Sequence, residues 1–136
     1  MKKLPTDLQI LNQIYEQYYN SFVTFSNDKK DRDTKIYIPI DIEKISKKLG
    51  VDIDIVFGRL YYHLDKKYGY KNEDGSSVYL FALKIGNDRH CINFPLAASV
   101  LAGLRDEDKR HQTSITLAVV SLFISIISIL LSIFSF

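Results

Sequence analysis

The sequence TSITLAVVSLFISIISILLSIFSF runs from Thr113 to Phe136 and contains no Lys, Arg, Asp, Glu, Pro or Gly. A helix of this length rises about 36 Å at roughly 1.5 Å per residue, which is enough to cross a hydrocarbon core of about 30 Å. Core helices of soluble domains seldom run this far without a charge. The chain is therefore predicted to carry a single C-terminal transmembrane helix over residues 113–136.

Small residues follow one another along this helix at alternating spacings of 4 and 3. Such a period of 3.5 residues keeps one face turned toward a neighbouring helix. In lipid, helices associate by close backbone approach and interhelical hydrogen bonds, and small residues and serine supply both. We therefore expect self-association through this face, as a packed interface or as a serine-lined pore. The face, called the serine seam below, consists of Ser114, Ala118, Ser121, Ser125, Ser128, Ser132 and Ser135.

A plainer interpretation of the serine seam stays open. A serine hydroxyl inside a helix bonds back to a carbonyl of its own chain, so serine is tolerated in a membrane span without any partner. Six serines on one seam argue against a scattered distribution. Self-association is therefore the first hypothesis, and conduction through a pore is a separate question.

The charges next to the span predict its orientation. Arg105, Lys109 and Arg110 lie just before it, and no charge follows it. The positive-inside rule weighs Lys and Arg near a span, so the preceding domain is expected in the cytoplasm. The Met1-Lys2-Lys3 start is not followed by an apolar run of signal-peptide length, and the lone Cys91 fits a reducing compartment. The predicted protein is single-pass, with a cytoplasmic N-terminal domain and a layout that resembles tail-anchored proteins.

The chain divides into a domain over residues 1–104, a charged juxtamembrane linker over 105–112 and the span over 113–136. About 100 residues suffice for one domain with its own core. All charges lie outside the span, and a formal net charge of +2 is too small to indicate nucleic acid by itself.

The domain begins with a predicted helix. Thr6 and Gln9 have the spacing of a capping box, and apolar residues recur at helical spacing from Leu8 to Phe25. Residues 27–35, NDKKDRDTK, show no periodicity and predict a solvated loop.

A helix-turn-helix is predicted next, after a short extended segment over residues 36–40. Asp41 and Asp52 are predicted N-caps, and Gly50 fits the position after the first helix. The apolar positions expected to form one core stripe on the second helix are Ile53, Phe57, Leu60, Tyr61, Leu64 and Tyr68.

A β-hairpin is predicted after Gly69, where the apolar period changes to 2. Its strands are residues 77–85 and 89–94, joined by Gly86-Asn87-Asp88. Pro95 then suits the first turn of another helix, which is expected to continue through residues 105–112 into the span.

This order of helix, helix-turn-helix and β-hairpin resembles the winged-helix superfamily at the level of the fold, over roughly residues 6–94. It predicts an α+β domain followed by one transmembrane helix. The resemblance implies DNA as a ligand, with the helix after Asp52 in the major groove. Against DNA, Asp52 and Asp54 would repel phosphate, and many winged-helix domains bind protein instead. The predicted face for a protein partner or nucleic acid comprises Lys47, Lys48, Arg59, Tyr62, Lys66, Lys67 and Arg89.

Enzymatic chemistry is not indicated. His63, His90 and His111 are scattered, and the sequence has none of the HExxH, CxxC, Walker or GxSxG motifs. His90 and Cys91 are neighbours that would point to opposite faces of a strand, so a packed Cys91 and an exposed His90 are expected rather than a catalytic pair or a metal site. No catalytic residue, metal ligand or cofactor is predicted.

The sequence leaves two main hypotheses for the function, which belong to different classes. In the first, the cytosolic domain senses or docks a partner protein, and the span associates and disturbs the membrane, a layout that resembles small membrane effectors of bacterial defence or toxin systems. In the second, the protein is a membrane-tethered DNA-binding regulator. The acidic start of the second helix and the regular serine seam favour the first. A third hypothesis is an assembly subunit that recruits a cytosolic partner to the membrane.

Overall fold

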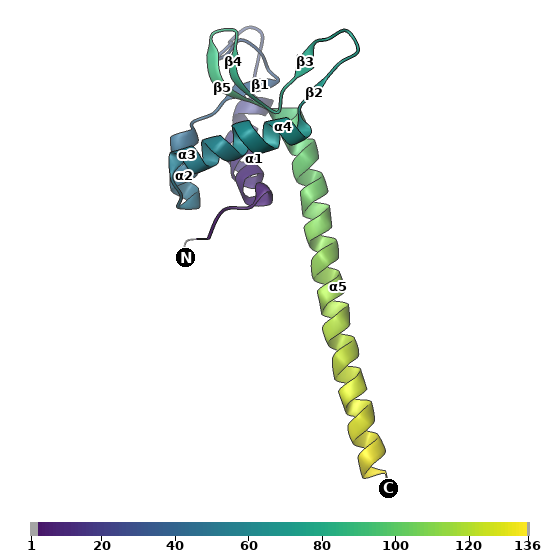
Figure 1. The fold of residues 1–136 in the computed structure, drawn as a ribbon. Helices are drawn as coiled ribbons and strands as arrows, with labels where there is room; N and C mark the ends of the chain where they lie inside the picture. The colour runs from purple at the N-terminus through teal and green to yellow at the C-terminus, as the bar shows by residue number, and fades with distance from the viewer. Residues whose placement is uncertain (1–2, 136) are drawn as a thin grey trace. The chain divides into compact units, whose positions relative to one another are not determined.

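The computed structural model describes residues 3–135, which divide into two compact units between Ala102 and Gly103. The first unit is a mixed α and β domain, and the second is helical (Figure 1). The elements in chain order are α1 (Asp7–Val23), β1 (Tyr37–Pro39), α2 (Ile42–Leu49), α3 (Ile53–Gly58), the π-helix η1 (Arg59–Leu64), α4 (Asp65–Tyr68), β2 (Tyr70–Lys71), β3 (Ser77–Val78), β4 (Phe81–Ile85), β5 (Asp88–Asn93) and α5 (Phe94–Phe134).

Helix α1 starts at the predicted capping box. The Gln9 N–H donates to Thr6 Oγ1 over 3.1 Å, and the Thr6 N–H donates to Gln9 Oε1 over 2.9 Å. Two free N–H groups of the first turn are thereby satisfied. The fully buried side chains of α1 are Ile10, Leu11 and Ile14. Two aromatic residues of α1 pack at the start of α5, where Phe94 stacks on Tyr15 and Phe22 at ring-centroid distances of 5.4 and 4.8 Å.

The N-caps predicted for the two helices after residues 36–40 form. The Lys44 N–H donates to Asp41 Oδ1 over 3.1 Å at the start of α2, and the Asp54 N–H donates to Asp52 Oδ1 over 2.9 Å at the start of α3. Gly50 ends α2 with a φ of 70°, in the left-handed region that glycine adopts without steric cost.

The second helix departs from the predicted core stripe, and its middle is the π-helix η1. Val56, Leu60 and Leu64 are buried, whereas Ile53 and Tyr61 are 42% and 38% exposed. In a π-helix the bonds run from residue i to i+5, and the Asp65 N–H indeed donates to the Leu60 carbonyl. The wider turn shifts side chains around the helix relative to their α-helical positions. Tyr61 lies within η1 and faces away from the core, contrary to the prediction.

The hairpin of β4 and β5 is confirmed, and β1 joins it to make an antiparallel sheet of order β1-β5-β4. Ile38 lies opposite Ile92, and Phe81 lies opposite Ile92 on its other side. The strand predicted over residues 77–85 is in fact two strands. Its first part, β3, pairs with β2 in a separate sheet, and only Phe81–Ile85 belongs to the larger one (Figure 1).

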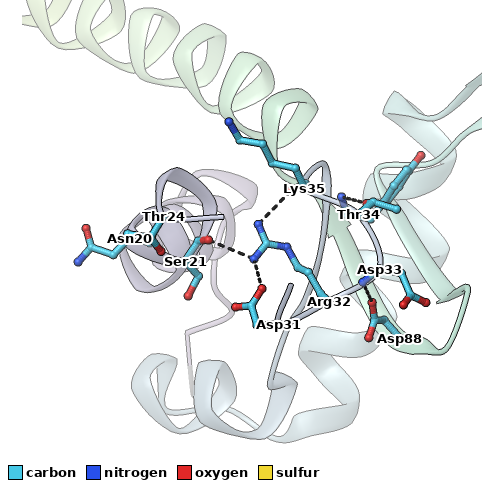
Figure 2. Close-up of polar contacts among 10 residues, drawn as sticks. Asn20, Ser21, Thr24, Asp31, Arg32, Asp33, Thr34, Lys35 and Asp88 are labelled. Carbon is cyan, nitrogen blue, oxygen red and sulfur yellow. Dashed lines mark hydrogen bonds and ion pairs between the residues drawn. The ribbon is translucent and has the colours of Figure 1, made fainter. Parts of the chain in front are cut away.

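The predicted solvated loop contains a buried arginine. The side chain of Arg32 is only 2% exposed and donates to the carbonyls of Ser21 and Lys35 and to Asp31 Oδ1, each over 3.0 to 3.1 Å (Figure 2). A buried guanidinium needs such acceptors, since an unpaired buried charge is strongly unfavourable. The loop is thereby tied to the end of α1 rather than left in solvent.

Helix α5 continues through the linker residues 105–112 without a break, as expected from the sequence. Its first turns belong to the domain core, where Phe94, Ala97 and Leu101 are buried. From Phe94 to Phe134 it is long and apolar enough to cross a membrane by length and composition.

Candidate functional site

The residues predicted to face a partner are mostly on the surface. Lys47, Lys48, Tyr62, Lys66, Lys67 and Arg89 are all exposed. Two of them also make contacts within the chain. Lys47 Nζ lies 3.1 Å from Glu43 Oε1, and Lys67 Nζ lies 5.3 Å from the centre of the Tyr68 ring. Exposed contacts of this kind stabilise a fold only weakly, so these cations stay available to a partner.

Arg59 differs from the expectation, because its guanidinium points to the start of α1. It pairs with Asp7 Oδ1 and donates to the Pro5 carbonyl over 2.9 Å. His63 Nε2 lies 3.2 Å from the other carboxylate oxygen of Asp7. Both partners of the Arg59–Asp7 pair are less than one third exposed. Arg59 thus fastens η1 to α1 and is not a free surface cation.

A groove lies beside η1 and β4, and we call it the tyrosine groove. It has a volume of about 620 Å³. Tyr62, Tyr79 and Leu83 are 70%, 42% and 44% exposed, so a large apolar area faces solvent. The lining residues are Tyr61, Tyr62, Asp65, Lys66, Tyr79, Phe81, Ala82, Leu83 and Lys84.

Sequence reasoning found Tyr62 and Lys66 of this groove but missed its other walls. The α-helical spacing predicts Tyr61 to be a core residue, but Tyr61 lies within the π-helix and is exposed. Tyr79 and Lys84 belong to the predicted hairpin, and nothing in their local pattern places them beside η1. The segment FALKI does not alternate between apolar and polar residues, so the sequence of β4 carried no signal for an outward face.

Asp65 lines this groove and connects its two walls. Its Oδ1 accepts the N–H groups of Leu80 and Phe81 over 2.8 and 3.1 Å. Its carbonyl accepts the Gly69 N–H over 2.7 Å, and a Cβ on Gly69 would lie 2.6 Å from that oxygen. One residue thus ends the helix, bends the chain at Leu80 and holds the first residue of β4 against η1. This clamp explains why the predicted strand over 77–85 is divided.

A second groove, the acidic groove, has a volume of about 680 Å³ and lies between the first residues of α2 and α3. Asp41, Glu43 and Asp54 lie around it, and His90 lines it with a φ of 55°, uncommon for a residue other than glycine. Phe57 separates the two grooves, since it lines the acidic groove and contacts Phe81 edge-to-face at 5.8 Å. The groove is lined by Tyr18, Pro39, Ile40, Asp41, Ile42, Glu43, Ile53, Asp54, Phe57 and His90.

Two groups near these grooves have shifted pKa values. Burial raises the pKa of the Tyr18 phenol, whose oxygen accepts the Asp41 N–H over 2.6 Å. Burial also raises the pKa of the Cys91 thiol to about 11, and Asp88 adds to the rise. The thiol therefore stays protonated at neutral pH, and a protonated thiol is a poor nucleophile.

Cys91 is expected to react slowly with iodoacetamide in the folded protein. A pKa of about 11 in place of 9.0 leaves about a hundredfold less thiolate at pH 8, and burial slows access further. The measurement is the labelling rate at pH 8, with the chain unfolded in guanidinium chloride as the control. Equal rates in the two states would show that the thiol is neither buried nor shifted.

The serine seam lies on one face of α5. At about 100° per residue its members fall within about 100° of arc. Three hydroxyls donate to carbonyls of the same helix: Ser125 to Ser121, Ser128 to Ile124 and Ser135 to Ser132, over 2.9 to 3.1 Å. Each donor is satisfied without a second helix, as the plainer interpretation requires. The hydroxyl oxygens keep acceptor capacity, and the face stays narrow enough for close approach.

The three cations before the span lie on exposed turns of α5. Arg110 pairs with Asp106 one turn earlier over 3.1 Å, and Lys109 accepts the Thr113 hydroxyl at its carbonyl. Arg105 lies on the same charged segment. An exposed i,i+4 pair such as Arg110–Asp106 contributes only weakly to the stability of the helix.

Neither metal-binding side chains nor similarity to known proteins identifies a function. Within residues 3–135, no group of three or more His, Cys, Asp or Glu side chains is arranged to hold a metal ion. No protein-family model matches the chain, and comparison with curated proteins and with solved structures found no match.

Proposed function

We propose that this chain is a non-enzymatic, single-pass membrane protein whose cytosolic winged-helix-like domain senses or docks a partner protein. Its span self-associates through the serine seam and acts as a membrane-disrupting effector. One observation carries the proposal. In the most apolar 18-residue window of α5, none of the residues is buried within the chain.

The cost of leaving this surface in water supports a lipid environment. Phe123, Leu131 and Phe134 are 63%, 66% and 82% exposed, and the aliphatic residues between them are similarly uncovered. Covering one such side chain is worth about 1.5–3 kcal/mol. A soluble monomer would forgo that gain over the whole span, whereas a bilayer supplies it.

The domain supports a docking role more than a DNA-binding role. Its order of α1, the helix-turn-helix and the β4–β5 hairpin agrees with the winged-helix resemblance. Arg59 is occupied by Asp7, and Asp52 and Asp54 start the helix that would enter the groove of DNA. Two grooves of several hundred Å³ with aromatic walls suit a protein partner better.

Membrane insertion is expected to resist alkaline carbonate. The full chain should stay in the membrane pellet, because extraction would expose the whole span. Replacing both Ile124 and Ile127 with Asp should release it, since each charge near the span centre costs about 2.5–3.5 kcal/mol. The matched control replaces both residues with Leu and should stay in the pellet. Release of the unaltered chain by carbonate would refute the membrane proposal.

The native mass in nanodiscs separates the proposed functions. An assembly of four or more chains supports the membrane effector, with depolarisation of liposomes as the following measurement. A dimer favours a membrane-tethered DNA-binding regulator or a recruiting subunit. Those two differ in salt-dependent binding of DNA, which only the regulator predicts.

A further inference from the structure

Strand β4 has an open edge. The sheet order is β1-β5-β4, and among residues 3–135 no strand pairs with β4 on the side away from β5. The Leu80 carbonyl accepts the Asn93 N–H over 2.9 Å, so it faces β5. Backbone groups alternate along a strand, which directs those of Phe81, Leu83 and Ile85 to the open edge. The Phe81 N–H donates to Asp65 Oδ1. The next backbone groups along β4 that point to the open edge are those of Leu83.

The tyrosine groove runs along this edge. Four consecutive residues of β4, Phe81 to Lys84, line it, and successive residues of a strand point to opposite faces of the sheet. A groove that touches all four therefore follows the edge of the strand and not one face. Tyr61 and Tyr62 of η1 form its opposite wall.

The charges of the groove favour an acidic occupant. Lys66 and Lys84 both line it and both are exposed. Among the described residues, Asp65 is the one carboxylate in the lining, and its Oδ1 is committed to two backbone N–H groups. A carboxylate entering the groove therefore meets two cations and one negative charge that is already hydrogen-bonded.

We infer that the tyrosine groove binds an extended, acidic segment of a partner protein, which adds to β4 as a further strand. The backbone of the segment pairs with the outward groups of Leu83, its apolar side chains contact Tyr62 and Tyr79, and its carboxylates meet Lys66 and Lys84. Strand addition gives affinity through backbone bonds and specificity through alternate side chains. A nucleic acid has no backbone amides to pair with this edge. The inference rests on the docking role proposed above and specifies the chemical class of the segment that docks.

The test uses the full chain in nanodiscs and two fluorescein-labelled heptapeptides. One alternates glutamate with valine, and the other carries lysine in place of each glutamate. The glutamate peptide should bind at least about tenfold more tightly. Replacing Lys66 and Lys84 with Glu should reverse the preference. The matched control, Lys29→Glu with Lys30→Glu, makes the same change in net charge on the exposed loop before β1 and should keep it.

The backbone part of the inference has its own variant. Leu83→Pro removes an outward N–H, which an edge strand tolerates, and should weaken binding about tenfold. Leu83→Ala keeps the N–H and should bind much better than Leu83→Pro. If Leu83→Pro does not fold, N-methylation of alternate amides in the peptide removes the same bonds from the partner's side.

Equal binding of the two peptides, or undiminished binding to folded Leu83→Pro, would overturn the inference. Binding of a single-stranded oligonucleotide in the groove, without peptide binding, would overturn it in favour of nucleic acid. The native mass of each nanodisc sample is recorded as well. Failure of the span to associate would contradict the effector proposal alone, whereas failure of peptide binding with an intact assembly would contradict the groove alone.

Discussion

Replacing both Ser125 and Ser128 with Leu is expected to abolish oligomers of the full chain in nanodiscs. The two serines lie at the middle of the serine seam, where backbones approach most closely if the helices pair along it. Leucine holds them apart and removes two hydroxyl acceptors. A single interhelical hydrogen bond in a membrane is worth about 0.6–1.7 kcal/mol, so the loss of two should cost about 1.2–3.4 kcal/mol per helix, and the leucines add the loss of close backbone approach. The hydrogen bonds alone account for about a 7- to 300-fold change in the association constant.

The control for this prediction lies off the seam. Ile126→Leu changes the branching of a side chain between the two serines in sequence but on a different side of the helix. It should leave the native mass unchanged. If it weakens the assembly as much as the serine double variant does, the seam is not the interface. The hydroxyls would then serve only their own backbone, as those of Ser125 and Ser128 do within α5.

Asp65→Ala should destabilise the domain by about 3–5 kcal/mol. The substitution removes the carboxylate that accepts the N–H groups of Leu80 and Phe81, and both of these residues are at most 1% exposed. Each buried donor left without a partner costs about 1–3 kcal/mol, and loss of a charged acceptor lies at the upper end. A domain of this size has only about 5–15 kcal/mol of stability in total.

Asp65→Asn is the matched control, since its side-chain oxygen can still accept both N–H groups. Hydrogen exchange followed by mass spectrometry on the full chain in nanodiscs gives the readout. The segment that contains Leu80 and Phe81 should exchange at least about a hundredfold faster in Asp65→Ala, while Asn stays close to the original protein. Unchanged exchange in Asp65→Ala would mean that the chain bends at Leu80 for another reason.

The same substitution links stability to the proposed docking surface. Asp65 holds the start of β4 beside η1, and those two elements form the walls of the tyrosine groove. Loss of the clamp should therefore loosen the groove before the rest of the sheet. Binding of the glutamate peptide is expected to fall in Asp65→Ala and to persist in Asp65→Asn.

The sequence alone determined the features that depend on neighbours along the chain. The capping box of Thr6 and Gln9, the caps at Asp41 and Asp52, and the left-handed Gly50 form as predicted. Each is a local hydrogen bond or a local backbone preference, so a few adjacent residues suffice to specify it. The helical apolar segment at the C-terminus is equally readable, because its length and lack of charge are properties of one continuous run.

Only the tertiary structure decided what depends on partners far apart in sequence. The Arg59–Asp7 pair joins residues 52 positions apart, and the Asp65 clamp reaches 15 and 16 positions ahead. The π-helix that contains Tyr61 cannot be told from an α-helix by periodicity, since the two share the same apolar residues over one or two turns. Burial of Arg32 likewise needs carbonyls from α1 and from its own loop. Such contacts arise only when the chain has folded, and one of them, the Asp65 clamp, holds the start of β4 beside η1 at the tyrosine groove.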